Sequence, residues 1–234
     1  MRVGLSGLGL HMNFFGHAAL AAELFTRDGA ARPASELARI CLGAMLPDFV
    51  TMLRLPRAVV TDAHVEEGVR FHHRTDHAFH ELTAFHELSR EAFAWLSERQ
   101  LPRGPARAVA HVGVEILLDE VLARSAAARG AYLSALEVPL SGAITFEQPS
   151  ELERLGALCG VLLERGRFYR VPEAALVAER VRRTLERRPR LATDDAGQAL
   201  LGEWVSVARP QVDAAAPALL AALRARLAEH AHPE

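Results

Sequence analysis

The chain has 234 residues and a formal net charge of −2, and half of its residues are hydrophobic. This much apolar surface excludes a wholly disordered chain, and two cysteines are too few for a disulfide scaffold. The near-zero net charge excludes a general electrostatic attraction to nucleic acid.

The opening segment is apolar, but His11, Asn13 and His17 interrupt it. A membrane span needs about 18 consecutive apolar residues, and no run in the sequence reaches that length. We therefore expect a cytoplasmic protein with no membrane partner. We also expect residues 1–11 to form an extension outside the core. Met12 is a candidate for the native start, and the sequence leaves the choice between Met1 and Met12 open.

Apolar residues recur at spacings of three and four, which predicts helices almost throughout. In chain order, the predicted helices cover residues 14–25, 36–53, 65–96, 106–127, 151–163, 173–185 and 196–227. The last one is expected to be interrupted by Pro210 and Pro217. Residues 130–148 are predicted to form a long loop, of a kind that often covers or binds a ligand. The sequence thus predicts an all-α, single-domain bundle of about seven to eight helices over residues 12–234.

Possible metal ligands are densest in the segment from Phe71 to His80. On a helix, residues four apart share a face with about 40° of drift per step, which places His72, Asp76 and His80 in one row. Imidazole and carboxylate at one-turn spacing suit a divalent transition metal. The alternative is a polar helix face with exposed histidines, and the number of ligand types in register favours the metal.

A second row of possible ligands, His111, Glu115 and Asp119, lies within an apolar run. Alone, this row fits an amphipathic helix with a narrow polar stripe slightly better than a metal site. Two helices that each carry such a row favour a metal, because facing helices of a bundle build metal sites in this way. His17 and Asp48 are isolated polar residues in apolar helices, and each alone is more typical of a structural role.

Five blocks of sequence follow one another in a characteristic order. They read Met-Asn-Phe-Phe-Gly-His (12–17), Gly-Ala-Met-Leu-Pro-Asp-Phe (43–49), Gly-Val-Arg-Phe-His-His-Arg-Thr-Asp (68–76), Glu-Ile-Leu-Leu-Asp-Glu-Val-Leu (115–122) and Arg-Arg-Pro-Arg-Leu (187–191). In residues and order they resemble the acyl carrier protein phosphodiesterase family, also called acyl carrier protein hydrolases. The sequence departs from the family pattern at His73, His80, Glu115 and Glu120, and these departures bear chiefly on the substrate.

The resemblance implies an all-helical fold remotely like that of HD-type phosphohydrolases. It also implies a divalent metal, typically Mn²⁺, with Fe, Mg or Zn as alternatives. The implied reaction is that of a phosphoric diester hydrolase, which releases 4′-phosphopantetheine from holo acyl carrier protein by metal-activated water. A metal held by His and Asp can lower the pKa of bound water and neutralise charge on phosphoryl oxygens. The candidate ligands are therefore compatible with the implied reaction.

The candidate residues fall into three roles. The metal candidates are His17, Asp48, His72, Asp76 and Asp119, with Glu115 and His111 as outer or second-metal ligands. Arg74 is the candidate for steadying the phosphoryl oxygens, and His73 or His80 for protonating the leaving serine oxygen.

An acidic carrier protein would need a basic surface. The candidates are Arg187, Arg188 and Arg190, preceded by three further arginines of the same run, Arg180, Arg182 and Arg183; Arg54, Arg57 and Arg70 form a second possible patch. The alternative is a solvated helix in which Glu179 and Glu186 balance the arginines. The sequence leaves the oligomeric state open.

Three other functions stay open at this point. One is an HD-like phosphohydrolase that acts on a nucleotide or another small phosphoester. Another is a non-catalytic helical binding module, in which the histidines are structural or exposed. A diiron oxidase is the third, and the lack of a paired Glu-x-x-His motif weakens it.

Overall fold

A computed structural model describes residues 14–27, 32–167, 172–186 and 188–229. The predicted all-α class is confirmed, with nine α-helices in these ranges instead of about seven to eight. They are α1 (Phe14–Arg27), α2 (Ala34–Leu53), α3 (Ala63–His80), α4 (Thr83–Glu98), α5 (Arg103–Leu122), α6 (Ala126–Leu136), α7 (Pro149–Arg167), α8 (Ala174–Glu186) and α9 (Asp195–Glu229). Among these described helices, none combines the length and apolarity needed to cross a membrane. The extension expected at residues 1–11 lies outside the described residues.

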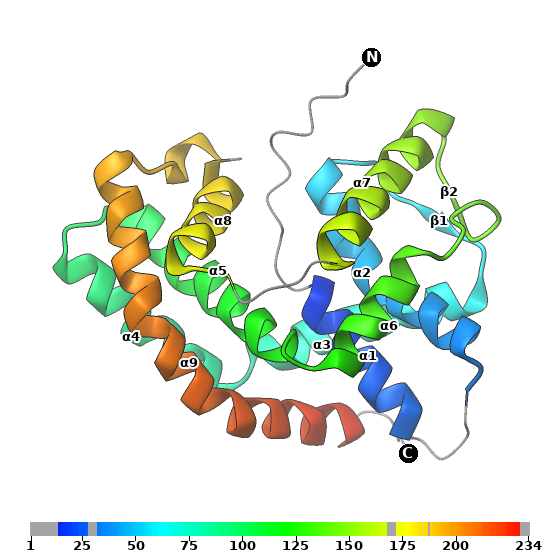
Figure 1. Cartoon of the computed structure of the whole chain (residues 1–234), viewed down its shortest axis with the longest axis horizontal. Helices are drawn as coiled ribbons and strands as arrows, with labels where there is room; N and C mark the ends of the chain where they lie inside the picture. The colour runs from blue at the N-terminus through cyan, green and yellow to red at the C-terminus, as the bar shows by residue number, and fades with distance from the viewer. Residues whose placement is uncertain (1–13, 28–31, 168–171, 187, 230–234) are drawn as a thin grey trace. The chain divides into compact units, whose positions relative to one another are not determined.

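The chain divides into two compact units, which are described separately (Figure 1). The α2 unit contains the described residues of Asn13–His77 and Leu122–Arg170, and so holds α1, α2, most of α3, α6 and α7. The α5 unit contains those of Ala78–Val121 and Val171–Glu234, and so holds α4, α5, α8 and α9. The expectation of one domain over residues 12–234 stays a prediction.

In the α2 unit, α1 packs along α2, and α6 packs against both. Aromatic rings join the three helices, since the Phe14 centroid lies 5.4 Å from that of Phe49 and 6.1 Å from that of Tyr132. Helix α2 is apolar on nearly all sides, as expected of a helix that neighbours cover all round. It is therefore the central helix of this unit.

Both cysteines are buried in the α2 unit. The Cys41 thiol donates to the Ala18 carbonyl oxygen at 3.5 Å and so links α2 to α1. Burial disfavours a thiolate and raises the pKa of each thiol, Cys41 and Cys159, to about 12.

Helices α2 and α3 approach each other at a pair of glycines. A Cβ atom added to Gly43 would lie 2.0 Å from the Val65 carbonyl oxygen and 3.0 Å from the Gly68 Cα. One added to Gly68 would lie 2.0 Å from the Ile40 carbonyl oxygen. No side chain larger than hydrogen fits at either position unless the helices separate, so these two glycines set the distance between α2 and α3.

The helix predicted over residues 65–96 is two helices, α3 and α4. The break comes at Leu82, whose backbone is extended (φ −71°, ψ 125°) and precedes α4. Leu82 is buried, and the rings of Phe79 and Phe85 on either side of it lie 4.5 Å apart. Apolar spacing continues through this turn, which is why periodicity alone could not locate it.

The last helix, α9, runs unbroken through both prolines, so the interruption expected at Pro210 and Pro217 is wrong. A proline inside a helix costs about 3 kcal/mol, because it removes a hydrogen bond and crowds the preceding turn. Burial of a large apolar side chain stabilises by about 1.5–3 kcal/mol. Helix α9 buries 11 residues, among them Trp204 against Gly113 of α5, and this burial exceeds the cost of two prolines.

The loop predicted over residues 130–148 is shorter than expected, because α6 continues to Leu136. The Ser125 side chain accepts from the Ala128 N–H and caps this helix, and Tyr132, Ala135 and Leu136 are buried. What remains of the loop is pinned by a two-residue antiparallel pairing of β1 (Val59–Val60) with β2 (Ile144–Thr145). Gly130 favoured a loop at this point of the sequence, but it is an exposed residue within α6.

Substitution of Gly68 by alanine tests the close contact of α2 and α3. We expect Gly68→Ala to lower the free energy of unfolding by about 1–3 kcal/mol or more, because the added carbon meets backbone that cannot yield. The measurement is thermal and denaturant unfolding followed by circular dichroism.

Gly160→Ala is the matched control for this change. Gly160 is exposed on α7, and nothing lies within 4 Å of an added Cβ there. Alanine at Gly160 should stabilise the protein by up to about 1 kcal/mol, through its better helix propensity. Equal effects of the two substitutions would contradict the proposed role of Gly68.

Candidate metal centres

Three predicted ligands meet in the α2 unit, one from each of α1, α2 and α3. We call His17, Asp48 and His72 the His17 cluster. Each offers one donor atom, and these atoms all lie within 4.8 Å of one another. The rings of His17 and His72 lie 4.1 Å apart, both are buried, and Asp48 is half-buried. Residues far apart in the sequence thus form one imidazole and carboxylate cluster, which contains three of the five primary metal candidates.

The structure fixes the tautomer of His72. Its Nδ1 lies 2.9 Å from the Ala44 carbonyl oxygen, and a carbonyl can only accept. Nδ1 therefore carries the hydrogen, and Nε2 keeps its lone pair. Burial, the largest influence, lowers the pKa of His72 and favours the neutral ring. A neutral histidine that donates from one nitrogen to a carbonyl is the usual arrangement of a metal ligand.

Helical spacing explains why these side chains meet. His72 lies one turn after Gly68, so it shares the face of α3 that touches α2. On α2, Asp48 lies one turn after Ala44, whose carbonyl oxygen bonds His72. His17 lies on the face of α1 that also buries Phe14 and Ala18. The glycine contact therefore brings the Asp48 and His72 faces together.

Three other candidates lie close to His72 in the sequence of α3. Asp76, one turn after His72, is half-buried, and its charge partly opposes the lowering of the His72 pKa. His73 is exposed, with its ring 5.3 Å from the His72 ring and nearly perpendicular to it. Arg74 is also exposed, and its guanidinium lies 6.0 Å from the centroid of the Phe71 ring.

A second group, which we call the His80 cluster, forms in the α5 unit. The His80 Nε2 lies 3.1 Å from the Glu115 Oε1 and 3.2 Å from the His111 Nε2. The His111 Nε2 lies 3.3 Å from the same Glu115 oxygen. Glu115 is buried, whereas His80 is half-buried and His111 exposed.

The predicted ligands thus divide between two clusters. His72 and His80, predicted to lie in one row, belong to different ones. Sequence reasoning found His111 and Glu115 from their one-turn spacing but assigned His80 to proton donation. The one sequence signal for this position of His80 is the turn that follows it, because a residue at the end of a helix can contact a helix that follows in the chain.

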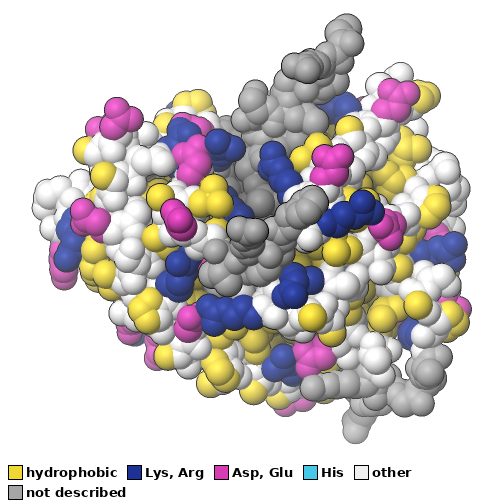
Figure 2. Space-filling model, in the orientation of Figure 1, with side chains coloured by type: hydrophobic (Ala, Val, Ile, Leu, Met, Phe, Trp, Pro, Cys, Tyr) yellow, Lys and Arg dark blue, Asp and Glu magenta, His cyan; other side chains and the backbone are white. Residues whose placement is uncertain are grey.

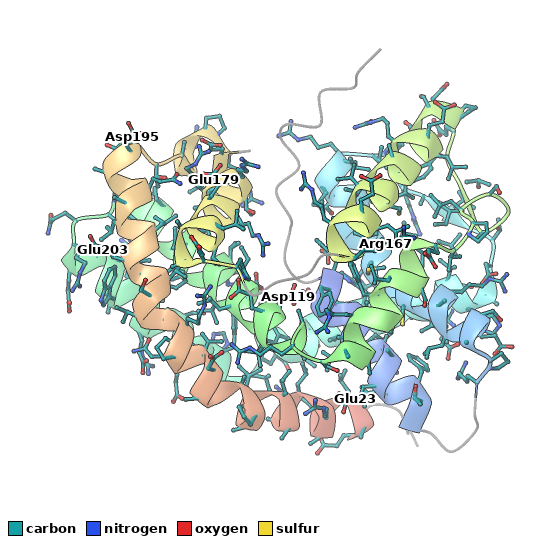
Figure 3. All side chains as sticks on the ribbon, in the orientation of Figure 1. Glu23, Asp119, Arg167, Glu179, Asp195 and Glu203 are labelled. Carbon is teal, nitrogen blue, oxygen red and sulfur yellow. The ribbon has the colours of Figure 1, made fainter. Side chains whose placement is uncertain are left out.

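Asp119 and Glu120 complete the candidates on α5. Asp119, labelled in Figure 3, is half-buried and belongs to the α5 unit, whereas the other four primary metal candidates belong to the α2 unit. Glu120, where the resembled family has histidine, is buried and accepts from Arg209 Nη2 at 3.1 Å. Arg209 also donates to the Pro172 carbonyl oxygen, so this departure has a structural role in joining α5 to α9.

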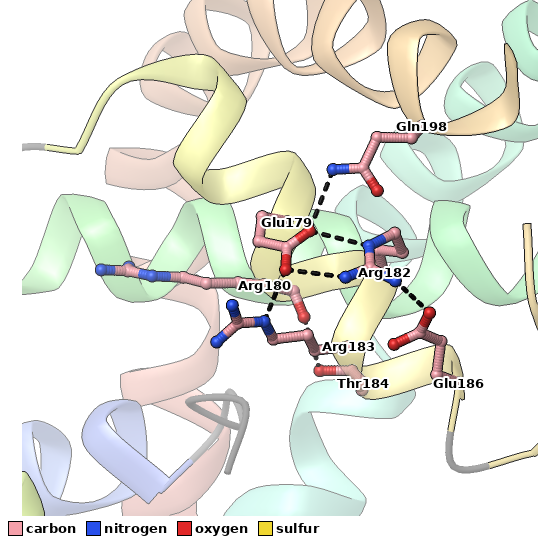
Figure 4. Close-up of polar contacts among 7 residues, drawn as sticks. All are labelled: Glu179, Arg180, Arg182, Arg183, Thr184, Glu186 and Gln198. Atoms are coloured by element: carbon pink, nitrogen blue, oxygen red, sulfur yellow. Dashed lines mark hydrogen bonds and ion pairs between the residues drawn. The ribbon is translucent and has the colours of Figure 1, made fainter. Parts of the chain in front are cut away.

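The arginine-rich run, predicted to bind an acidic partner, lies on α8 and just beyond it. Glu179 accepts two hydrogen bonds from Arg182 and one each from Arg183 and Gln198 (Figure 4). Arg182 also pairs with Glu186. The charges of Arg182 and Arg183 are therefore balanced within the unit, as the alternative interpretation held.

The rest of the run differs from this paired stretch. Arg188 and Arg190 are exposed: Arg188 immediately precedes a short 3₁₀-helix (η1, Pro189–Leu191), and Arg190 lies within it. Arg187 lies outside the described residues. In the second possible patch, Arg54 and Arg57 are exposed, and Arg70 pairs with Glu66. Basic and acidic side chains are interspersed on the face that Figure 2 shows.

Comparison of the chain with models of protein families, with curated proteins and with solved structures finds no match.

Loss of one equivalent of bound metal is expected when the His17 cluster is altered. Asp48→Asn and His72→Ala each remove a donor, so either should lower the Mn²⁺ bound at equilibrium dialysis by about one ion per chain. Asp195→Asn, an exposed carboxylate at the start of α9, is the matched control and should bind as the wild type does. Unchanged binding in both cluster variants would contradict the site.

The Glu179 network predicts a pH dependence of stability. Hydrogen bonds from Arg182, the largest influence, hold the pKa of Glu179 at about 2, against 4.5 for an ordinary glutamate. A carboxyl with a depressed pKa stabilises the fold above its unfolded pKa, and this stabilisation is lost as the pH falls through the folded value. Glu179→Gln should therefore lower the melting temperature near pH 7, and the difference from wild type should narrow between about pH 4.5 and 2.

Thermal unfolding by circular dichroism across this pH range is the measurement. Glu203→Gln, at an exposed position on α9, is the control. A difference from wild type that stays constant down to pH 2 would rule out the network as its cause.

Proposed function

We propose that this protein is a metal-dependent phosphodiester hydrolase with its centre at the His17 cluster. The observation that carries the proposal is the convergence of three side chains from three helices at positions where the sequence resembles a hydrolase family. The donor set suits a divalent ion, since it combines two imidazoles with a carboxylate, and His72 is oriented by the Ala44 carbonyl. When bound, such an ion would supply Lewis-acid stabilisation of charge on a phosphoryl group.

The residues around the cluster support binding and proton transfer. The exposed guanidinium of Arg74 can bind two phosphoryl oxygens of a substrate in bidentate fashion. His73, exposed beside His72, can donate a proton to a leaving alkoxide. The half-buried carboxylate of Asp76 contributes negative charge that favours a cation at His72.

For the substrate, we propose 4′-phosphopantetheine attached to acyl carrier protein, as the resemblance implies. Arg188 and Arg190, which are exposed and separated only by Pro189, are the basic side chains that we propose to meet an acidic carrier protein. Arg182 and Arg183 are less suited, since Glu179 and Glu186 already pair with them. A nucleotide or another small phosphoester would need the His17 cluster but not this surface.

The test is release of phosphopantetheine from holo acyl carrier protein in the presence of Mn²⁺. We expect the wild type to release it and Asp48→Asn and Asp76→Asn to lose at least about 10-fold in kcat/KM, because loss of even an indirect metal partner costs about 10–100-fold. Asp195→Asn should stay at the wild-type rate.

Three other outcomes would change the proposal. Hydrolysis of a model diester such as bis(p-nitrophenyl) phosphate, without release from the carrier protein, would keep the reaction class and refute the substrate. Bound metal with neither reaction would favour the binding module. A near-ultraviolet absorption band that depends on added iron would favour the diiron alternative.

A further inference from the structure

The His80 cluster has no part in the proposed hydrolysis, yet its three donor atoms form a nearly equilateral triangle. Its sides are 3.1, 3.2 and 3.3 Å, and its corners are the His80 Nε2, the His111 Nε2 and the Glu115 Oε1. A contact of this kind between three donor atoms of metal-ligating residues calls for a physical cause.

Hydrogen bonds alone do not account for all three sides. Each Nε2 carries at most one hydrogen, and an ionised carboxylate carries none. A hydrogen that points along one side of the triangle lies about 60° from the next side, far outside hydrogen-bond geometry. If both histidines donate to Glu115, their nitrogens face each other at 3.2 Å with no hydrogen between them. If His111 donates to His80, both contacts to the carboxylate lack a hydrogen.

A cation satisfies all three donors together, because each then presents a lone pair to one point. The corners of this triangle lie about 1.8–1.9 Å from its centre. An ion about 1 Å above the plane would be about 2.1 Å from each atom, which is the range of zinc–nitrogen and zinc–oxygen bonds. Distances of 3.1–3.3 Å between ligand atoms are thus those of a tetrahedral site with three protein ligands.

The burial of Glu115 and the packing of Phe85 on the two histidines also favour a bound cation. The Glu115 side chain is only 5% exposed, and a buried carboxylate is costly unless a positive charge compensates it. The Phe85 ring meets His80 and His111 edge to face, with centroids at 5.4 and 5.1 Å, and so restrains both imidazoles. Because His111 is exposed, the site has a side open to solvent, where a fourth ligand such as water can bind.

We propose that His80, His111 and Glu115 form a second metal site, which binds Zn²⁺ through three protein ligands and leaves the fourth position open. Two imidazoles and one carboxylate are a donor set that zinc takes up when a coordination position stays free. The proposal does not depend on the proposed hydrolase function, since the site shares no residue with the His17 cluster.

The experiment titrates metal-free full-length protein with Zn²⁺ alone. Asp48→Asn serves as the parent, so that the His17 cluster does not obscure the result. We expect the parent to bind one equivalent of Zn²⁺ by isothermal titration calorimetry. His111→Ala in this parent should weaken that binding at least about 100-fold, because one of three ligands is removed. His86→Ala is the matched control, since His86 is exposed on the neighbouring α4, and it should leave binding unchanged.

Cobalt provides a second readout. Co²⁺ in place of Zn²⁺ should give the intense visible absorption of a four-coordinate ion in the parent and lose it in Glu115→Gln. Circular dichroism checks that each variant is folded. If Glu115→Gln does not fold, His111→Ala still tests the site, because His111 is exposed. Failure of the folded parent to bind Zn²⁺, or equal binding in the parent and in His111→Ala, would overturn the proposal. Neither result would bear on Mn²⁺ binding by wild-type protein at the His17 cluster.

Discussion

The contact of Gly43 with Gly68 is the constraint on which the α2 unit depends. Two helices whose backbones approach this closely can share polar groups that ordinary side chains would hold apart. The His72 ring therefore reaches a carbonyl oxygen of α2 directly, and the carboxylate of Asp48 comes within reach of both buried imidazoles. The glycines contribute no chemistry themselves, but the spacing of the donors follows from their lack of a side chain. This also gives a physical reason why glycine stands at both positions, 43 and 68.

The two clusters solve the same electrostatic problem in different ways. Each places a carboxylate beside two imidazoles, where a cation would balance the negative charge. In the His17 cluster the histidines are buried and the carboxylate is half-buried, whereas in the His80 cluster the carboxylate is buried and the histidines reach solvent. In the first arrangement, burial lowers the pKa of His72 and so favours its neutral ring. In the second arrangement, the imidazoles of His80 and His111 remain accessible to solvent.

The sequence was sufficient for local features and insufficient for how distant segments pair. Apolar periodicity predicted the helical class and most helices, and one-turn spacing identified His111 with Glu115 as a pair. It also placed His72 and His80 in one row, but two steps of about 40° rotate the second by about 80° around the helix. Such a rotation is enough for the two histidines to face different neighbours. The partners of His80 and the pairing of Glu120 with Arg209 depend on tertiary contacts, which the local sequence does not predict.

Burial of both cysteines has a practical consequence for spectroscopy. Maleimides react with thiolates, and thiols with a pKa of about 12 are almost entirely protonated at neutral pH. The native protein therefore offers a background of low thiol reactivity. A single cysteine introduced at an exposed position on α4 and another on α7 would take fluorophores or spin labels selectively. Distances between the two units could then be measured in solution, with the natural cysteines left in place.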